Sequence, residues 1–168
     1  TTPNVEGSVL PKLGFRFEMP SSAENITWLG RGPFDNYHDR NYAAHWGIYH
    51  STVTEQWTNF VRPQETGNKE DVRWLAVTTN AGKGLLYVSP SGMSTTVGHW
   101  RAEDIYTNRG NRKGHPYEVT FQRNTVVSLD AWNRALGNAS CGPDVLDKYE
   151  RKLKQTPFCF MILPINEA

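Results

Sequence analysis

The stretch Trp28–Arg40, WLGRGPFDNYHDR, decides how the rest of the sequence is interpreted. It places two glycines and a proline among three aromatic residues and several ionisable side chains. Gly30, Gly32 and Pro33 disfavour regular structure, and the aromatic residues are too apolar for a loop that stays in water. The pattern predicts a packed loop of fixed shape. Loops of this kind, held by rigid strands, often carry binding or catalytic groups.

Length and charge limit the classes of protein that fit this sequence. The 168 residues suit one domain with its own core. Net charge is +1 and the Lys and Arg residues are scattered, so no nucleic-acid partner is expected. No apolar segment is long enough to cross a membrane, which predicts a soluble chain without a membrane partner. Because the sequence begins TTPNVEG without an initiator methionine, residues 1–9 are interpreted as the tail of a longer product and 10–168 as the domain.

Outward from the opening stretch, short segments with strand patterns dominate the sequence. Apolar and polar residues alternate in several of them, and glycine-rich turns separate them. The expected strands are Leu13–Met19, Asn25–Leu29, Asp71–Thr79, Leu85–Val88, Ser94–Trp100, Glu118–Arg123, Thr125–Trp132 and Phe158–Leu163. One short helix is expected at Ala102–Asn108, and irregular coverage at Tyr42–Tyr49 and Val53–Phe60. Many short strands with little helix predict an all-β, antiparallel sandwich.

Four sequence blocks occur together in one order. After WLGRGPFDNYHDR come RPQETGNKEDVRWL at Arg62–Leu75, HWRAEDI at His99–Ile105 and SLDAWNRALGNASCGP at Ser128–Pro143. Together they resemble the C-terminal small-chain region (domain 5) of the bacterial β-galactosidases of glycoside hydrolase family 2. The resemblance covers about Leu10 to Leu163. It implies a β-supersandwich of the galactose-mutarotase-like kind, here without its N-terminal opening strands.

The resemblance also implies a division of labour within a longer enzyme. Such an enzyme hydrolyses terminal β-linked galactose, lactose included, and its two catalytic glutamates lie in an upstream barrel, about 5 Å apart as retaining hydrolysis requires. The chain would then contain no catalytic residue and no cofactor. Its partners would be that barrel and the galactoside substrate, and the parent would form a homo-oligomer. The compartment stays open between cytoplasm and periplasm.

One loop of the family reaches the rim of the galactose site, and GNASCGP matches it here. Some members carry a Trp at the position of Cys141 and stack it on the sugar beyond the galactose. A thiol is small and weakly polar, so the resemblance implies a wider, less adhesive subsite, with Asn138 and Ser140 as polar contacts. A buried small residue in a glycine-rich loop is the alternative for Cys141.

Other residues keep more than one interpretation. Asp35, Asn36, Tyr37 and Asp39 either only hold their turn and fill the core, or support the rim from behind. The scattered histidines indicate no metal site. Pairs such as His99 with Glu103, or His115 with Glu118, resemble the acid–base pairs of free mutarotases only in composition.

Two other functions stay open for the whole chain. The first alternative is an independent galactoside-binding module that stacks sugars on exposed Trp side chains. The second is a purely structural or assembly domain with exposed apolar surface.

Overall fold

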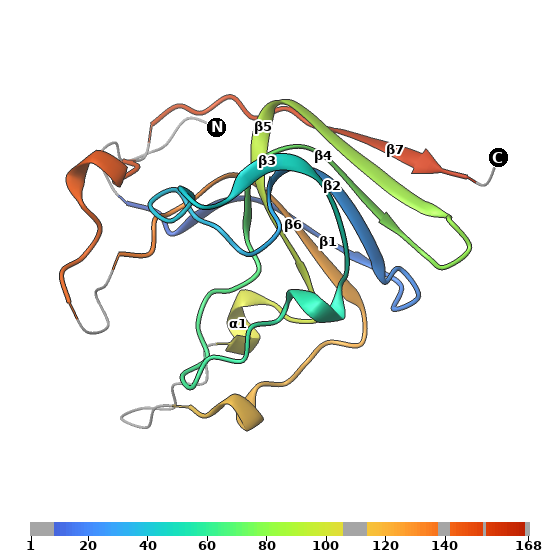
Figure 1. The fold of residues 1–168 in the computed structure, drawn as a ribbon, viewed down its shortest axis with the longest axis horizontal. Coiled ribbons are helices and arrows are strands. Elements are labelled where there is room, and N and C mark those ends of the chain that lie inside the picture. Colours follow the sequence, from blue (N-terminus) through green and yellow to red (C-terminus); the bar gives the residue numbers. More distant parts are fainter. Residues whose placement is uncertain (1–8, 106–113, 138–141, 153, 167–168) are drawn as a thin grey trace.

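A computed structural model describes residues 9–105, 114–137, 142–152 and 154–166. Within these residues the chain forms one antiparallel sheet with little helix (Figure 1), which confirms the predicted all-β class. The strands are β1 (Lys12–Met19), β2 (Asn25–Gly32), β3 (His45–Thr52), β4 (Lys69–Thr78), β5 (Gly84–Gly98), β6 (Thr125–Asn133) and β7 (Met161–Ile165). The helical segments are α1 (Ala102–Ile105) and the 3-10 turns η1 (Thr54–Gln56), η2 (Pro116–Glu118) and η3 (Asp147–Tyr149). Figure 1 shows α1, η1 and η2 gathered at one end of the sheet. No helix in the described part of the chain is long and apolar enough to cross a membrane.

The sheet is built on β5, its longest strand. Neighbouring strands follow the order β1-β6-β5-β4-β2-β3. β4 pairs with one side of β5, whereas β7 pairs with Gly84–Val88 on the other side and β6 with Ser94–Gly98. One face of this sheet, which we call the inner face, carries Trp28, Leu75 and Tyr87 in one cross-strand row and forms the buried core.

The opening stretch differs from its predicted loop structure. Its first residues continue β2, and only the part after Gly32 is a loop. A Cβ on Gly30 would lie 2.9 Å from Val72, and one on Gly32 would lie 2.7 Å from Tyr49. The two glycines therefore serve close packing between neighbouring strands rather than a turn.

Other strand predictions are partly confirmed. The strands at β1, β4 and β6 and the β4–β5 hairpin lie where expected. The segment expected as irregular coverage contains β3, which pairs with β2 along its whole length. The strands expected at 85–88 and 94–100 are one strand that continues through Pro90. The strand expected at 118–123 is absent, since η2 ends there. β7 forms, but its side chains are largely exposed rather than buried between layers.

Candidate functional site

The loop after Gly32 is held against the start of β4 by Asn36. The backbone N–H of Asn36 donates to the carbonyl of Asn68 (2.8 Å), whose side-chain amide donates back to the Asn36 carbonyl (2.8 Å). The side-chain oxygen of Asn36 accepts the backbone N–H of Glu70 (2.9 Å). Both amide side chains are buried, so these bonds fix the loop without competition from water.

Each of the two neighbours of Asn36 has a buried side-chain oxygen that makes no hydrogen bond within the described part of the chain. The Tyr37 hydroxyl and Asp35 Oδ2 have no hydrogen-bond partner among the described residues. Burial raises the pKa of the Tyr37 phenol well above its ordinary value. Tyr37 therefore fills the core as a neutral aromatic side chain, as its structural interpretation predicts.

Asp39 connects this loop to the residues that directly precede the segment 138–141. Its two carboxylate oxygens accept hydrogen bonds from the backbone N–H groups of Leu136 (3.1 Å) and Gly137 (2.8 Å). Gly137 has a φ of +58°, and a Cβ there would lie 2.7 Å from the backbone nitrogen of Val145. The residues on the two sides of 138–141 are thus packed against each other.

Arg134 holds the residues that follow the segment 138–141. Its guanidinium donates to Glu150 (2.8 and 3.1 Å) and to both carboxylate oxygens of Asp144 (3.2 Å). The hydrogen bonds to Glu150, and then those to Asp144, outweigh desolvation and raise the pKa of Arg134 above its ordinary value. The segment that leads out of 138–141 is thereby tied to the end of β6.

His38 completes the contacts of the loop. Arg151 donates to its Nδ1 (3.1 Å), and its ring packs edge-on against Tyr149. Desolvation, and then the charge of Arg151, lower the pKa of His38. A neutral His38 can accept this bond.

The structure brings together only part of the site expected from the sequence. Asp35, Asn36, Tyr37 and Asp39 lie in one loop, and Asp39 reaches the start of the expected rim segment. The expected rim residues Asn138, Ser140 and Cys141 lie outside the described residues.

The structure shows other contacts for the histidines and glutamates that resemble mutarotase acid–base pairs in composition. His99 Nε2 contacts Glu24 (2.9 Å), and Glu103 instead binds Arg16. Desolvation raises the pKa of Glu24, but its bonds with Thr54 and His99 outweigh this, and the net pKa is lowered. The carboxylate of Glu118 accepts the backbone N–H of His115 (2.8 Å) and so closes η2.

His99 lies at the edge of an aromatic pocket. Trp57 contacts Trp100 and Phe121 edge-on, with ring centroids 5.0 and 5.1 Å away. The pocket has a volume of about 450 Å³ and is also lined by Glu24. Its aromatic walls are the feature that the alternative of a sugar-binding module would use.

A polar group that involves β1 and β6 was not predicted from the sequence. Lys12 lies 3.3 Å from Glu65 and 3.6 Å from the buried carboxylate of Asp130. Ser128 and Asp130 alternate with apolar residues in the middle of β6, and this alternation was the available signal. Among the described residues, no three His, Cys, Asp or Glu side chains gather where they could hold a metal ion.

The fold and this site define an all-β domain in which the residues on both sides of 138–141 are held near the end of β6. Comparison with known proteins assigns the family. The family described as "Beta galactosidase small chain" matches residues 1–162, and the chain belongs to this family.

Individual relatives agree with this assignment. The β-galactosidase of Arthrobacter sp. (strain B7) is 31% identical over 138 residues, which are 82% of this chain and 14% of that protein. The β-galactosidase of Priestia megaterium is 44% identical over 77 residues, 46% of this chain and 7% of that protein. The Kluyveromyces lactis β-galactosidase is 28% identical and covers 89% of this chain and 14% of its own length. The chain thus spans a small fraction of the relatives that it matches.

Proposed function

We propose that this chain is a non-catalytic domain of a β-galactosidase. The parent enzyme hydrolyses terminal β-linked galactose, as in lactose, by the retaining mechanism of glycoside hydrolase family 2. Its two catalytic carboxylates belong to an upstream barrel. The chain completes the rim of the sugar site with the loop that carries Asn138, Ser140 and Cys141, and it braces the barrel.

A row of outward-facing side chains is the observation that carries the bracing role. Paired residues share a face of a sheet, and the register aligns one residue from each of five strands on the face opposite the core. This outer row consists of Ile48 on β3, Leu29 on β2, Trp74 on β4, Val88 on β5 and Met161 on β7.

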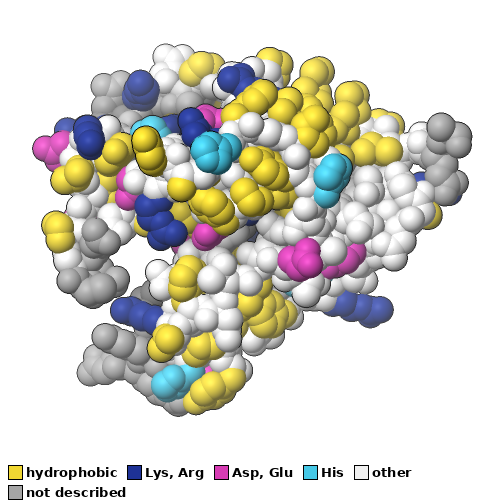
Figure 2. All heavy atoms as spheres, viewed as in Figure 1, with side chains coloured by type: hydrophobic (Ala, Val, Ile, Leu, Met, Phe, Trp, Pro, Cys, Tyr) yellow, Lys and Arg dark blue, Asp and Glu magenta, His cyan; other side chains and the backbone are white. Residues whose placement is uncertain are grey.

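The outer row leaves apolar surface in contact with solvent. Ile48 is 59% exposed and Met161 is 49% exposed. Figure 2 shows hydrophobic side chains gathered over the part of the molecule that contains β3, β5 and β7. A continuous apolar surface of this kind is typical of an interaction site. Its position on a wide sheet suits a large, rigid partner such as a barrel.

The anchored loop supports the rim role. Asp39 binds the backbone that precedes residues 138–141, and Arg134 binds Asp144 and Glu150, which follow them. A rim fixed in this way positions substrate without supplying a reacting group. Asp39 is then the support that the sequence interpretation places behind the rim.

The test is a chimeric enzyme. The matching region of the Arthrobacter sp. (strain B7) β-galactosidase is replaced by this chain, and hydrolysis of a nitrophenyl β-galactoside and of lactose is measured. The chimera is expected to hydrolyse both, whereas the same enzyme without this region, and the chain alone, are expected to be inactive. Turnover by the chain alone would contradict the proposal, because its catalytic groups would then lie here.

A substitution within the chimera tests the rim itself. Cys141→Trp is expected to lower KM for lactose about fivefold, which corresponds to about 1 kcal/mol of added stacking. KM for the nitrophenyl galactoside is the comparison, since its leaving group is not a sugar. Unchanged KM values for both substrates would place Cys141 away from the rim.

A further inference from the structure

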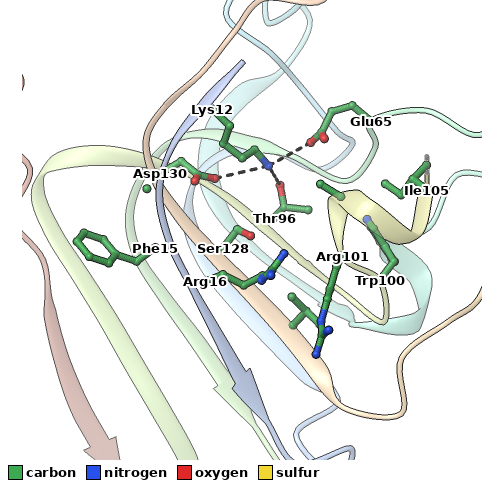
Figure 3. Close-up of a pocket in the computed structure, with 13 residues that line it drawn as sticks. Lys12, Phe15, Arg16, Glu65, Thr96, Trp100, Arg101, Ile105, Ser128 and Asp130 are labelled. Atoms are coloured by element: carbon green, nitrogen blue, oxygen red, sulfur yellow. Dashed lines mark hydrogen bonds and ion pairs between the residues drawn. The ribbon is translucent and has the colours of Figure 1, made fainter. Parts of the chain in front are cut away.

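A second cavity lies along β6, where Val126, Ser128 and Asp130 line it. It has a volume of about 200 Å³ and lies between β1, β6 and the segment that contains α1. Figure 3 shows Lys12, Glu65, Thr96 and Asp130 along one side, with Trp100 beside them. Its lining combines these polar groups with the apolar side chains of Trp100 and Ile105.

Strand register places the polar wall. Ser128 lies between Arg16 on β1 and Thr96 on β5 in one cross-strand row. Asp130, two residues along β6, shares the face of Ser128 and lies opposite Gly14. A Cβ at Gly14 would lie 2.3 Å from Asp130 Oδ1, so glycine is required for the carboxylate to occupy this place.

Asp130 is a buried carboxylate with incomplete hydrogen bonding. Its side chain is 3% exposed, and Oδ2 has no hydrogen-bond partner among the described residues. The ammonium group of Lys12 lies 3.6 Å from Oδ2, too far for a hydrogen bond. Buried carboxylate oxygens are normally satisfied by donors. The cavity in front of Asp130 is the place from which a donor can come.

The environment of Asp130 disfavours its charge. Desolvation raises its pKa to about 6, and the nearby Glu65 and Glu70 add to this, while Lys12 opposes it. Desolvation also lowers the pKa of Lys12, but the charges of Glu65 and Asp130 outweigh it, so the net pKa is raised. A donor from a ligand would relieve part of the cost of burying this carboxylate.

The charges around the cavity already have opposite partners. Lys12 faces Glu65 and Asp130. At the mouth, Arg16 binds Glu103 at 2.7 Å, and the guanidinium of Arg101 binds Glu18. A charged ligand would have to compete with these pairs. A neutral ligand can instead add hydrogen bonds to them.

We propose that this cavity binds a neutral monosaccharide or a related small polyol. A hydroxyl of the ligand donates to Asp130 Oδ2, and another accepts from the ammonium of Lys12. Hydroxyl groups suit the site because each can both donate and accept. The apolar wall of Trp100 and Ile105 suits the C–H face of a sugar ring. Among the described residues, none from Arg134 onward lines this cavity, and the proposal does not depend on the proposed function.

The test is a titration of the full, ¹⁵N-labelled chain followed by NMR. The probes are galactose, glucose and glycerol as neutral ligands, and galactose 6-phosphate as a charged one, each raised to about 100 mM so that a millimolar Kd saturates. Saturable shifts at Gly14, Thr96 and Ser128 with a neutral probe are the expected result. No saturation with any neutral probe would overturn the proposal, as would tighter binding of the phosphate or shifts centred on Trp57 and Phe121.

Variants locate the binding in this cavity. Ser128→Leu fills it from the sheet and is expected to weaken binding at least tenfold. Thr96→Val keeps the side-chain shape, removes one hydroxyl and is expected to weaken binding about threefold, which keeps the test valid if Ser128→Leu does not fold. The control is Asp71→Asn, because Asp71 binds Arg31 and lines no part of the cavity. Unchanged affinity in a folded Ser128→Leu or Thr96→Val variant would overturn the proposal.

Discussion

Asp39 connects parts of the chain that are 97 residues apart in sequence. Its two carboxylate oxygens each accept one backbone N–H from Leu136 and Gly137. Hydrogen bonds to a charged acceptor are stronger than those between neutral groups. At the scale of a single residue, this carboxylate therefore holds Leu136 and Gly137 in place, directly before the proposed rim residues.

Asp39→Asn is expected to destabilise the chain by about 1–2 kcal/mol, because the amide can accept only through its oxygen and turns its NH₂ group toward the second N–H. Urea denaturation measures the loss, and hydrogen exchange at Leu136 and Gly137 is expected to become faster. The control is Asp147→Asn, an exposed carboxylate in the nearby η3. Equal effects of the two substitutions would contradict a specific role of Asp39.

Lys69 is a buried amine, and its titration makes stability depend on pH. It donates to Gln56 (2.8 Å) and to the carbonyl of Gly67 (3.2 Å). Desolvation lowers its pKa from 10.5 to about 8, although the charge of Asp35 opposes this. Between these two values the unfolded chain binds more protons than the folded one, so stability rises with pH in that window.

The rise of stability with pH gives a prediction for Lys69→Met. From pH 7.5 to 9.5, deprotonation of Lys69 is expected to add about 2 kcal/mol to the stability of the wild type, and this increment should be missing in the variant. Urea denaturation at the two pH values measures the difference. Lys154→Met, at an exposed lysine, is the control and should keep the wild-type increment. If Lys69→Met also keeps the increment in stability, Lys69 is not the titrating group.

At the scale of elements, β1 and β6 depend on close contact at one irregular position. Their register shifts between Leu13 and Gly14. A Cβ on Gly14 would also lie 2.3 Å from the backbone oxygen of Leu129, which cannot move away as a flexible side chain could. The shift and the glycine together let β6 approach β1.

Gly14→Ala is therefore expected to cost about 3 kcal/mol through overpacking, measured by thermal unfolding. Gly82→Asn is the control. Gly82 has a φ of +75°, which asparagine tolerates, and a Cβ there meets nothing within 4 Å. Similar losses at the two positions would attribute the effect to backbone freedom rather than to the contact with β6.

Alternation of apolar and polar residues in the sequence predicted those strands that have one apolar and one polar face. β1, β4 and β6 carry such alternation, and their positions were confirmed. β3 was missed because its inward Tyr49 and its outward Trp46 and Ile48 are all apolar, so no alternation marks it. β5 was divided at Pro90, yet the strand continues there because this proline lies where pairing with β4 is irregular.

The candidate site was less predictable than the fold for a physical reason. The sequence pointed to the loop of Asn36, Tyr37 and Asp39, whose residue types are common in turns. It did not reveal that Asp39 meets Leu136, nor that Lys12 meets Asp130, because these contacts depend on strand order and register. Local patterns carry no information on such distant pairs.

At the scale of the whole molecule, the outer row gives the sheet two apolar faces. The inner face is closed by its own core, whereas the outer row is exposed at Ile48 and Met161 and only partly buried between them. Strands with one buried face normally present polar residues on the other. The row therefore fits a domain that packs against the rest of its parent, and it would cause self-association in isolation.

The double variant Ile48→Lys, Met161→Lys tests this relation. In the chain alone both side chains are largely exposed, so the free energy of unfolding is expected to change by less than about 1 kcal/mol, while sedimentation should show less self-association.

In the chimeric β-galactosidase the same charges would be buried against the barrel, where an unpaired charge is costly. The half-life of hydrolysis on heating is therefore expected to fall severalfold there. Tyr42→Lys, at a fully exposed side chain, is the control in both proteins. If the chimera withstands heating equally well with and without the double variant, the outer row does not face the barrel, and the bracing role must lie on another surface of the sheet.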